Sequence, residues 1–139
     1  MTKLQRKLKN LAVQYSLQLI YAFGSRAKEA YEMTVGKREA FRPSSSDLDI
    51  GLKSQRLLSV EDRVRMAIFF EDLFGVPRVD VVVLPEAPIM LALEIVQGEL
   101  LFAKDDRYEA EYQLYIMRLA AEIAPFEKKK RDLILETRT

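Results

Sequence analysis

The sequence predicts a layered α/β (α+β) fold, with helices packed on a small sheet of three to four strands. Apolar runs of strand length alternate along the chain with segments whose apolar residues recur at helical spacing. The chain has 139 residues, the length of one compact domain, and 49% of them are apolar, as in ordinary globular proteins. We therefore expect a single domain over residues 1–139, with a C-terminal helical extension from about residue 105.

The first part of the chain predicts two helices around a strand. Apolar residues recur at helical spacing over residues 4–15, with lysine and glutamine on the opposite face. The apolar run over 17–23 has the length of a strand and ends abruptly at Gly24-Ser25. A second helix is expected from near Ser25 toward Met33.

A loop and a second strand are expected next. Residues 34–46 predict a flexible connection, because they contain Gly36, Pro43 and three consecutive serines. Polar and apolar side chains alternate over residues 47–52, as they do in a half-buried strand.

The middle of the chain predicts a capped helix and the clearest strand. Ser59 followed three residues later by Asp62 is typical of a helix start, and Gly75 and Pro77 would stop that helix. The β-branched run over 79–84 predicts a strand. After this helix start, five apolar residues recur at broadly helical spacing: Val60, Val64, Ala67, Ile68 and Phe70.

The C-terminal part predicts a short helix, a small strand and a long helix. Pro88 can open the short helix and Gly98 can close it, and residues 100–102 form the small strand. The long helix begins near Asp105, and Pro125 is expected to kink or interrupt it. We expect one face of this helix to pack on the core; it carries Tyr108, Tyr112, Ile116, Leu119 and Ile123.

The composition excludes several kinds of active site. The chain has no histidine, no cysteine and no tryptophan. Thiolate nucleophiles, disulfides, iron–sulfur clusters and Ser-His-Asp triads are therefore excluded, and zinc would lack its usual nitrogen and sulfur ligands. Carboxylates remain, and these favour hard cations such as Mg²⁺ or Mn²⁺. If the chain is an enzyme, we expect carboxylate–metal chemistry.

Charge and hydropathy limit the partners and the location. The 22 basic and 21 acidic residues give a net charge of +1, so direct nucleic-acid binding is not expected. The charged run 127–131 is expected to be a solvated helix end. No apolar run approaches the ~20 residues of a membrane span, and the N-terminus has no apolar signal-peptide core. We therefore expect a cytoplasmic protein without a membrane partner.

Gly24-Ser25, between a strand and a helix, is the first candidate site. A glycine lets backbone approach a ligand closely, free N–H groups at a helix start favour phosphate, and a serine hydroxyl adds a donor. The alternative is an ordinary turn with Ser25 as the helix N-cap, and for this short motif taken alone it is favoured. Arg26 is either a phosphate contact or a solvated helix residue.

Asp47-Leu48-Asp49 is the second candidate site. Residues i and i+2 of a strand face the same side, so both carboxylates point one way. A bound divalent cation would relieve their mutual repulsion. A solvated face near a sheet edge explains the same pattern equally well.

Asp80, within the apolar strand 79–84, is the third candidate. An unpartnered carboxylate is costly to bury, so its presence in such a strand needs a reason. If this strand lies beside residues 47–52, Asp80 completes a cluster of three carboxylates. Such a cluster could hold two hard cations about 3.5–4 Å apart, the arrangement that supports displacement at phosphorus. The alternative is an exposed strand start next to Arg78.

Together, Gly24-Ser25, Asp47-x-Asp49 and Asp80 resemble the nucleotidyltransferase superfamily of the DNA polymerase β type. The small size resembles its minimal members, the MNT proteins. The segment 94–102 and the long helix with Ala124-Pro125-Phe126 are similar to those of MntA-type antitoxins, which are paired with HEPN toxins. The resemblance covers the chain from about Leu17 to Phe126.

One departure from the family concerns the spacing of these motifs. Here 21 residues, Arg26 to Ser46, separate Ser25 from Asp47, whereas the family usually has fewer. We expect the additional residues to lengthen the helix after Ser25 or to add a loop over the site.

The resemblance implies a polymerase β-like nucleotidyltransferase fold with a small mixed sheet, over a single minimal nucleotidyltransferase domain. The implied reaction is transfer of a nucleoside monophosphate, AMP from ATP, to a hydroxyl. It assigns the β- and γ-phosphates to Gly24 and Ser25, and two Mg²⁺ ions, which Mn²⁺ could replace, to Asp47, Asp49 and Asp80. Asp80 would also help the acceptor hydroxyl lose its proton. The implied acceptor is a tyrosine of a HEPN toxin, an RNase that such antitoxins silence by adding AMP.

Three alternatives remain open. The chain could neutralise a partner by contact alone, through residues 26–46 or the aromatic face of the long helix, although a pure binder does not need three aspartates. It could transfer the nucleotide to a small molecule, although related drug-modifying enzymes carry an additional helical domain. A nucleic-acid polymerase fragment is poorly supported. Homo- and hetero-oligomers are both compatible with the sequence.

Overall fold

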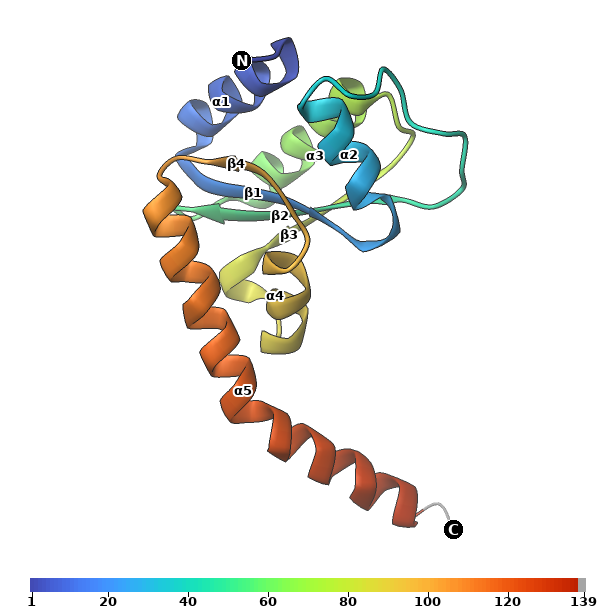
Figure 1. Ribbon diagram of the computed structural model, residues 1–139, viewed down its shortest axis with the longest axis vertical. Coiled ribbons are helices and arrows are strands. Elements are labelled where there is room, and N and C mark those ends of the chain that lie inside the picture. The colour runs from blue at the N-terminus through green and yellow to red at the C-terminus, as the bar shows by residue number, and fades with distance from the viewer. Residues whose placement is uncertain (138–139) are drawn as a thin grey trace.

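A four-stranded mixed sheet forms the centre of the computed structural model, which describes residues 1–137. The strand order is β3-β2-β1-β4 (Figure 1). β1 (Leu17–Phe23) pairs antiparallel with β2 (Leu48–Ser54) and with β4 (Glu99–Ala103), whereas β2 pairs parallel with β3 (Val79–Val83). The predicted α/β fold with a small mixed sheet is therefore confirmed.

Helices cover both faces of the sheet, so that the fold has three layers (Figure 1). Two 3₁₀ turns, η1 and η2, connect strands to helices; they span Gly24–Arg26 and Leu84–Glu86. On one face lie α1 (Lys3–Tyr15), α2 (Ala27–Thr34) and α3 (Val60–Phe74), and on the other α4 (Ile89–Val96) and α5 (Asp106–Thr137).

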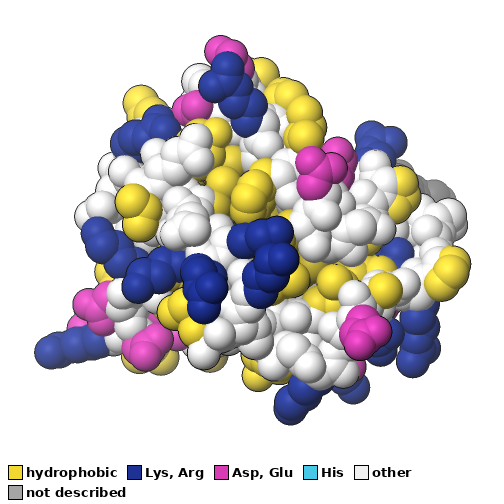
Figure 2. All heavy atoms as spheres, turned by 90° about the horizontal axis from the view of Figure 1, so that it is seen from above, with side chains coloured by type: hydrophobic (Ala, Val, Ile, Leu, Met, Phe, Trp, Pro, Cys, Tyr) yellow, Lys and Arg dark blue, Asp and Glu magenta, His cyan; other side chains and the backbone are white. Residues whose placement is uncertain are grey.

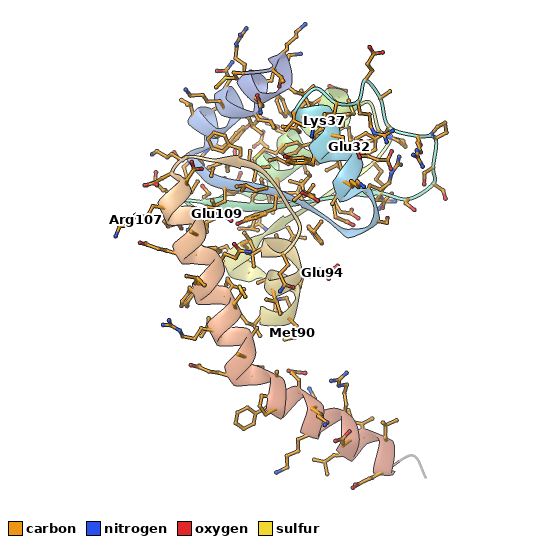
Figure 3. All side chains as sticks on the ribbon, in the orientation of Figure 1. Glu32, Lys37, Met90, Glu94, Arg107 and Glu109 are labelled. Carbon is orange, nitrogen blue, oxygen red and sulfur yellow. The ribbon has the colours of Figure 1, made fainter. Side chains whose placement is uncertain are left out.

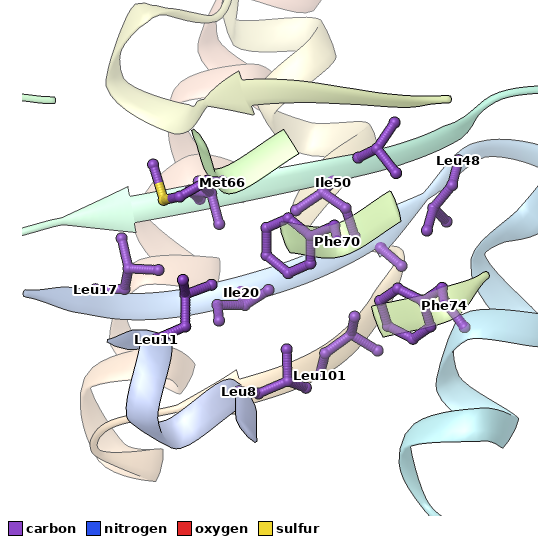
Figure 4. Packing of buried hydrophobic residues seen from close by; sticks show 14 of the residues in the cluster. Leu8, Leu11, Leu17, Ile20, Leu48, Ile50, Met66, Phe70, Phe74 and Leu101 are labelled. Atoms are coloured by element: carbon purple, nitrogen blue, oxygen red, sulfur yellow. The ribbon is translucent and has the colours of Figure 1, made fainter. Parts of the chain in front are cut away.

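Buried apolar side chains fill both interfaces between the helices and the sheet. Alternate residues of each strand point to opposite faces, so each strand contributes to both interfaces. In β2, Leu48 and Ile50 are fully buried on the side of α1, α2 and α3. Gly51 lies on the other side, close to Ile95 of α4, and Asp49 faces the same way. Figure 4 shows the first interface, where Met66, Phe70 and Phe74 of α3 pack against Leu8, Leu11, Leu17 and Ile20.

The start of α3 agrees with the sequence prediction, but its buried face does not. Ser59 and Asp62 form a reciprocal capping box, in which each backbone N–H donates to the other side chain at 3.0 Å. The buried residues are Met66, Phe70 and Phe74, because these larger side chains share one face at i, i+4 and i+8. Of the five predicted positions Phe70 is buried, whereas Val60, Val64 and Ile68 are exposed.

The long helix α5 continues through Pro125 and bends near its middle (Figure 1), so the predicted kink is observed and the alternative of an interruption is not. Proline removes the hydrogen bond to the carbonyl four residues earlier, which belongs to Ala121. That residue is exposed, so water can bind the freed carbonyl and the helix can continue. Residues 127–131 are exposed, as expected of a solvated helix.

The distribution of charged side chains and the apolar content of the helices agree with the near-zero net charge and the hydropathy of the sequence. Lys and Arg side chains are dispersed among acidic and apolar ones on the face that α1, α2 and α3 cover (Figure 2). Within residues 1–137, no helix has the length and apolar content needed to cross a lipid bilayer.

Candidate active site

The sheet topology brings the predicted site residues to one edge. β1 ends at Phe23, next to the start of β2, because these two strands are antiparallel. β3 starts at the same edge, because it runs parallel to β2. In this register Phe23 pairs with Asp49, and Asp49 pairs with Asp80. Three segments distant in the sequence therefore meet at the turn that begins with Gly24.

Gly24 lies against the carboxylate of Asp49. Its backbone φ is +76°, a left-handed conformation that favours glycine. A Cβ atom at this position would lie 2.6 Å from Oδ2 of Asp49, closer than real Cβ atoms approach any atom. The conformation of the turn therefore favours glycine, and any larger residue at this position would displace the carboxylate of Asp49.

Ser25 lies within the 3₁₀ turn η1 and is exposed. Neither η1 nor α2 has a side-chain hydrogen bond at its N-cap, in the part of the chain that the structure describes. The alternative in which Ser25 caps the helix was therefore wrong, because the chain enters α2 through a 3₁₀ turn that contains the serine. Backbone N–H groups at this helix start, together with the Ser25 hydroxyl, are suited to bind phosphate oxygens.

The carboxylate of Asp49 is surrounded by three other acidic side chains at this edge. Burial raises the pKa of Asp49 above its ordinary value, and the charges of Asp80, Asp47 and Glu94 raise it further. The raised pKa means that burial first, and the surrounding negative charge second, disfavour the ionised form of Asp49. A bound cation would reverse that effect, and an all-carboxylate set of ligands suits a hard divalent ion.

The carboxylates converge without forming a complete metal site. Among residues 1–137, no group of three or more acidic side chains is arranged to hold a metal ion. Asp80 is exposed at the start of β3. Asp47, which precedes β2, is partly exposed, and its Oδ2 lies 3.7 Å from Nε of Arg78 in an ion pair. Both side chains are accessible enough to reorient toward a bound ion.

Glu94 was not predicted as a site residue. It lies on α4, on the side of that helix nearest the turn after β1 (Figure 3). It is the one acidic residue in the otherwise apolar helix Ile89–Val96. A lone acid in an apolar segment is the signal that identified Asp80, and the same signal could have identified Glu94.

Arg26 is buried, with 3% of its surface exposed, so the alternative of a solvated helix residue was wrong. Its guanidinium forms an ion pair with Glu29 at 3.1 Å and lies over the ring of Phe41. It also donates hydrogen bonds to the carbonyl oxygens of Arg42, at 2.5 Å, and Ser46, at 3.4 Å. A direct phosphate contact would require Arg26 to give up some of these bonds.

The additional residues between Ser25 and the aspartates form a loop, since α2 ends at Thr34. This loop is fastened to the domain at several points. The backbone N–H of Arg42 donates to Glu29 at 2.8 Å, and Phe41 packs edge-on against Phe74 with ring centroids 5.8 Å apart. The hydrogen bond from Arg26 lowers the pKa of Glu29, so this carboxylate stays ionised at the base of the loop. The loop thus connects the Gly24 turn to Asp47 along a defined path.

Solved structures similar to this chain come from toxin–antitoxin complexes. A toxin–antitoxin structure with AMP-PNP has 20% identity and a TM-score of 0.69, covering 94% of this chain and 98% of that one. An MntA complex in which two aspartates, two positions apart, are changed to glutamate has 20% identity, a TM-score of 0.69 and the same coverage, 94% and 98%. A complex of tri-AMPylated Shewanella oneidensis HEPN toxin with its MNT antitoxin has 20% identity and a TM-score of 0.67, covering 95% and 96%.

At this level of identity, the structural likeness establishes the fold. No curated protein matches the sequence. Residues 6–107, which include the Gly24 turn and all three aspartates, match the family described as polymerase beta, nucleotidyltransferase. The chain therefore belongs to the polymerase β nucleotidyltransferase family.

Proposed function

We propose that this protein transfers AMP from ATP to a tyrosine hydroxyl of a HEPN-family partner, and thereby acts as an antitoxin. The observation that carries the proposal is the convergence of the Gly24 turn with Asp47, Asp49 and Asp80 at one edge of the sheet. The similar complexes support it, because one contains AMP-PNP and another an AMPylated HEPN toxin. A reaction that uses ATP also fits the cytoplasmic location expected from the sequence.

The proposed roles follow from the chemistry of each group. Asp47, Asp49 and Asp80 would hold two Mg²⁺ ions, or Mn²⁺ in their place. When bound, these ions would neutralise charge on the triphosphate and on the reacting oxygens. The backbone N–H groups of the Gly24 turn and the hydroxyl of Ser25 would bind the β- and γ-phosphates.

In the proposed reaction, the acceptor oxygen attacks the α-phosphorus of ATP. A bond forms between these two atoms, while the bond from the α-phosphorus to the oxygen that bridges to the β-phosphate breaks. Pyrophosphate leaves with the bridging oxygen. The proton of the acceptor hydroxyl passes to the carboxylate of Asp80, which is exposed and can release it to solvent.

A labelling experiment tests this function. The protein is incubated with Mg²⁺, ATP labelled at the α-phosphate, and a candidate HEPN-family partner protein. We expect label on the partner, and none when ATP is labelled at the γ-phosphate. Asp47→Asn and Asp80→Asn should abolish labelling, whereas the matched control Asp72→Asn, an exposed position on α3, should not.

The double variant Asp47→Asn/Asp49→Asn separates catalysis from neutralisation by contact. If this variant still labels the partner, the proposed catalytic residues are wrong. If it leaves the partner unlabelled but neutralises it as the unmodified protein does, contact alone explains the antitoxin role.

A further inference from the structure

The apolar face of α5 continues beyond the part of the helix that packs on the domain. Its positions follow one another in alternating steps of four and three residues, the spacing of a helix that packs along another helix. Lys130 is the one polar residue on this face. The positions are Tyr112, Ile116, Leu119, Ile123, Phe126, Lys130 and Leu133.

The first half of this face is used within the domain. Ile116 is 4% exposed, and Tyr112 packs with it in the apolar cluster of α4 and the sheet. Nε2 of Gln113 donates to the carbonyl of Val96 at 3.1 Å, which fixes this half against the end of α4. The interaction of α4 with α5 thus anchors the half of the helix from which the rest projects.

The second half leaves the domain (Figure 1), and it carries exposed apolar side chains. Phe126 is 73% exposed and Leu133 is 53% exposed. Together with Lys129, Lys130 and Ile134 they line a shallow hollow of about 390 Å³. Exposed apolar side chains that gather on one surface mark an interaction site, so this projecting half-helix is expected to gain stability from a partner.

The charges around this hollow argue against a second copy of the chain as its occupant. A symmetric pair built on one surface places the same patch of both copies in one interface. Lys129 and Lys130 of both copies would then bring four ammonium groups into that interface, and no acidic residue lines the hollow to compensate. A helix with apolar side chains flanked by Asp or Glu complements both the apolar floor and the two ammonium groups.

We propose that the surface formed by Phe126, Lys129, Lys130 and Leu133, here called the α5 docking surface, binds such an acidic, amphipathic helix of the HEPN-family partner. This inference rests on the proposed function, because that function supplies the partner. Docking on α5 would hold the acceptor protein on the same side of the sheet as α4 and Glu94.

Binding measurements with the purified HEPN-family protein test the proposal. Phe126→Ser and Leu133→Ser should each weaken the complex at least tenfold, and Lys129→Glu/Lys130→Glu should weaken it and remove most of its salt dependence. Leu135→Ser and Lys128→Glu are matched controls, because both positions lie on the opposite side of the helix; both should bind normally. Circular dichroism should show the same thermal unfolding for all variants.

Two results would overturn the docking proposal. One is equal binding by Phe126→Ser and the unmodified protein, or no binding by either. The other is a dimer of the protein alone that Phe126→Ser dissociates, because a second copy would then occupy the surface. Binding of ATP, measured without the partner, should be unchanged in these variants. A complex that needs Phe126 but yields no label would refute the transferase function and leave the docking surface intact.

Discussion

Asp49 of β2 and Asp80 of β3 occupy paired positions on neighbouring parallel strands, and both face the side of the sheet that carries α4. Two carboxylates in such positions repel each other, and Asp47 and Glu94 add further negative charge. The fold therefore maintains a concentration of negative charge that weakens the domain itself. Such an arrangement is expected where the charge serves binding or catalysis rather than stability.

The first prediction concerns the stability that the folded protein loses by keeping Asp49 ionised beside the other carboxylates. The pKa of Asp49 is raised in the folded protein, so the folded state holds the proton more tightly than the unfolded state does. Without metal, stability should therefore fall as pH rises from the ordinary Asp pKa through the raised one. Asp49→Asn should raise the melting temperature by a few degrees at pH 7, and Mg²⁺ should reduce that difference. A lower melting temperature for Asp49→Asn without metal would contradict this account.

The second prediction concerns Gly24. Gly24→Ala should destabilise the protein by about 1–2 kcal/mol from the left-handed backbone alone. It should also weaken ATP binding, because the new Cβ displaces the carboxylate of Asp49. Gly75→Ala is the control, since φ there is +65° but no atom lies within 4 Å of the added Cβ. Equal ATP binding by both variants, measured by calorimetry, would show that the Asp49 contact is irrelevant.

The third prediction concerns Arg26 as a positioning residue for Asp47. Arg26→Gln removes the buried partner of the partly exposed Glu29 carboxylate, at an expected cost of about 1–3 kcal/mol, and should free the loop over 35–46. Hydrogen exchange should accelerate in that loop, and the rate of transfer should fall more than the affinity for ATP. Arg26→Lys should restore part of the loop's protection from hydrogen exchange and part of the transfer rate. Arg65→Gln, which removes an exposed pair with Glu61, is the control.

A loss of ATP affinity in Arg26→Gln, with the hydrogen exchange of the loop unchanged, would instead favour the direct phosphate contact.

The fourth prediction concerns Glu94, whose charge contributes to the raised pKa of Asp49. Glu94→Gln should increase the Mg²⁺ concentration needed for half-maximal transfer several-fold, because less negative charge then attracts the cation. Glu122→Gln, on the exposed surface of α5, should have no effect. A magnesium titration that gives the same midpoint for Glu94→Gln and the unmodified protein would exclude this role.

Local patterns were sufficient to predict most of the fold. The apolar run of β1 and the Ser59 cap of α3 were predicted at the positions where they occur. The buried face of α3 was predicted wrongly, because two apolar stripes compete on that helix and only tertiary packing selects the one with Phe70 and Phe74. The continuation of α5 through Pro125 depends on the solvent exposure of the preceding helical turn, and the sequence does not reveal that exposure.

The candidate site was predicted in part for a similar reason. Asp47, Asp49 and Asp80 could be grouped because the alternation within strands limits where their side chains point. Arg26 could not be placed, since its partners Arg42 and Ser46 belong to an irregular loop without periodicity. Every residue has a backbone carbonyl group, so the sequence does not indicate which carbonyl groups accept hydrogen bonds from Arg26.

The central claim is that the carboxylates at the Gly24 turn transfer AMP to a partner protein. Intact-mass and peptide mass spectrometry of the HEPN-family protein, after incubation with this protein, ATP and Mg²⁺, tests it most directly. The account predicts that the partner gains one or more adenylyl groups on tyrosine, and that Asp47→Asn/Asp49→Asn adds none. A partner that stays unmodified yet is neutralised equally by both proteins would contradict the claim.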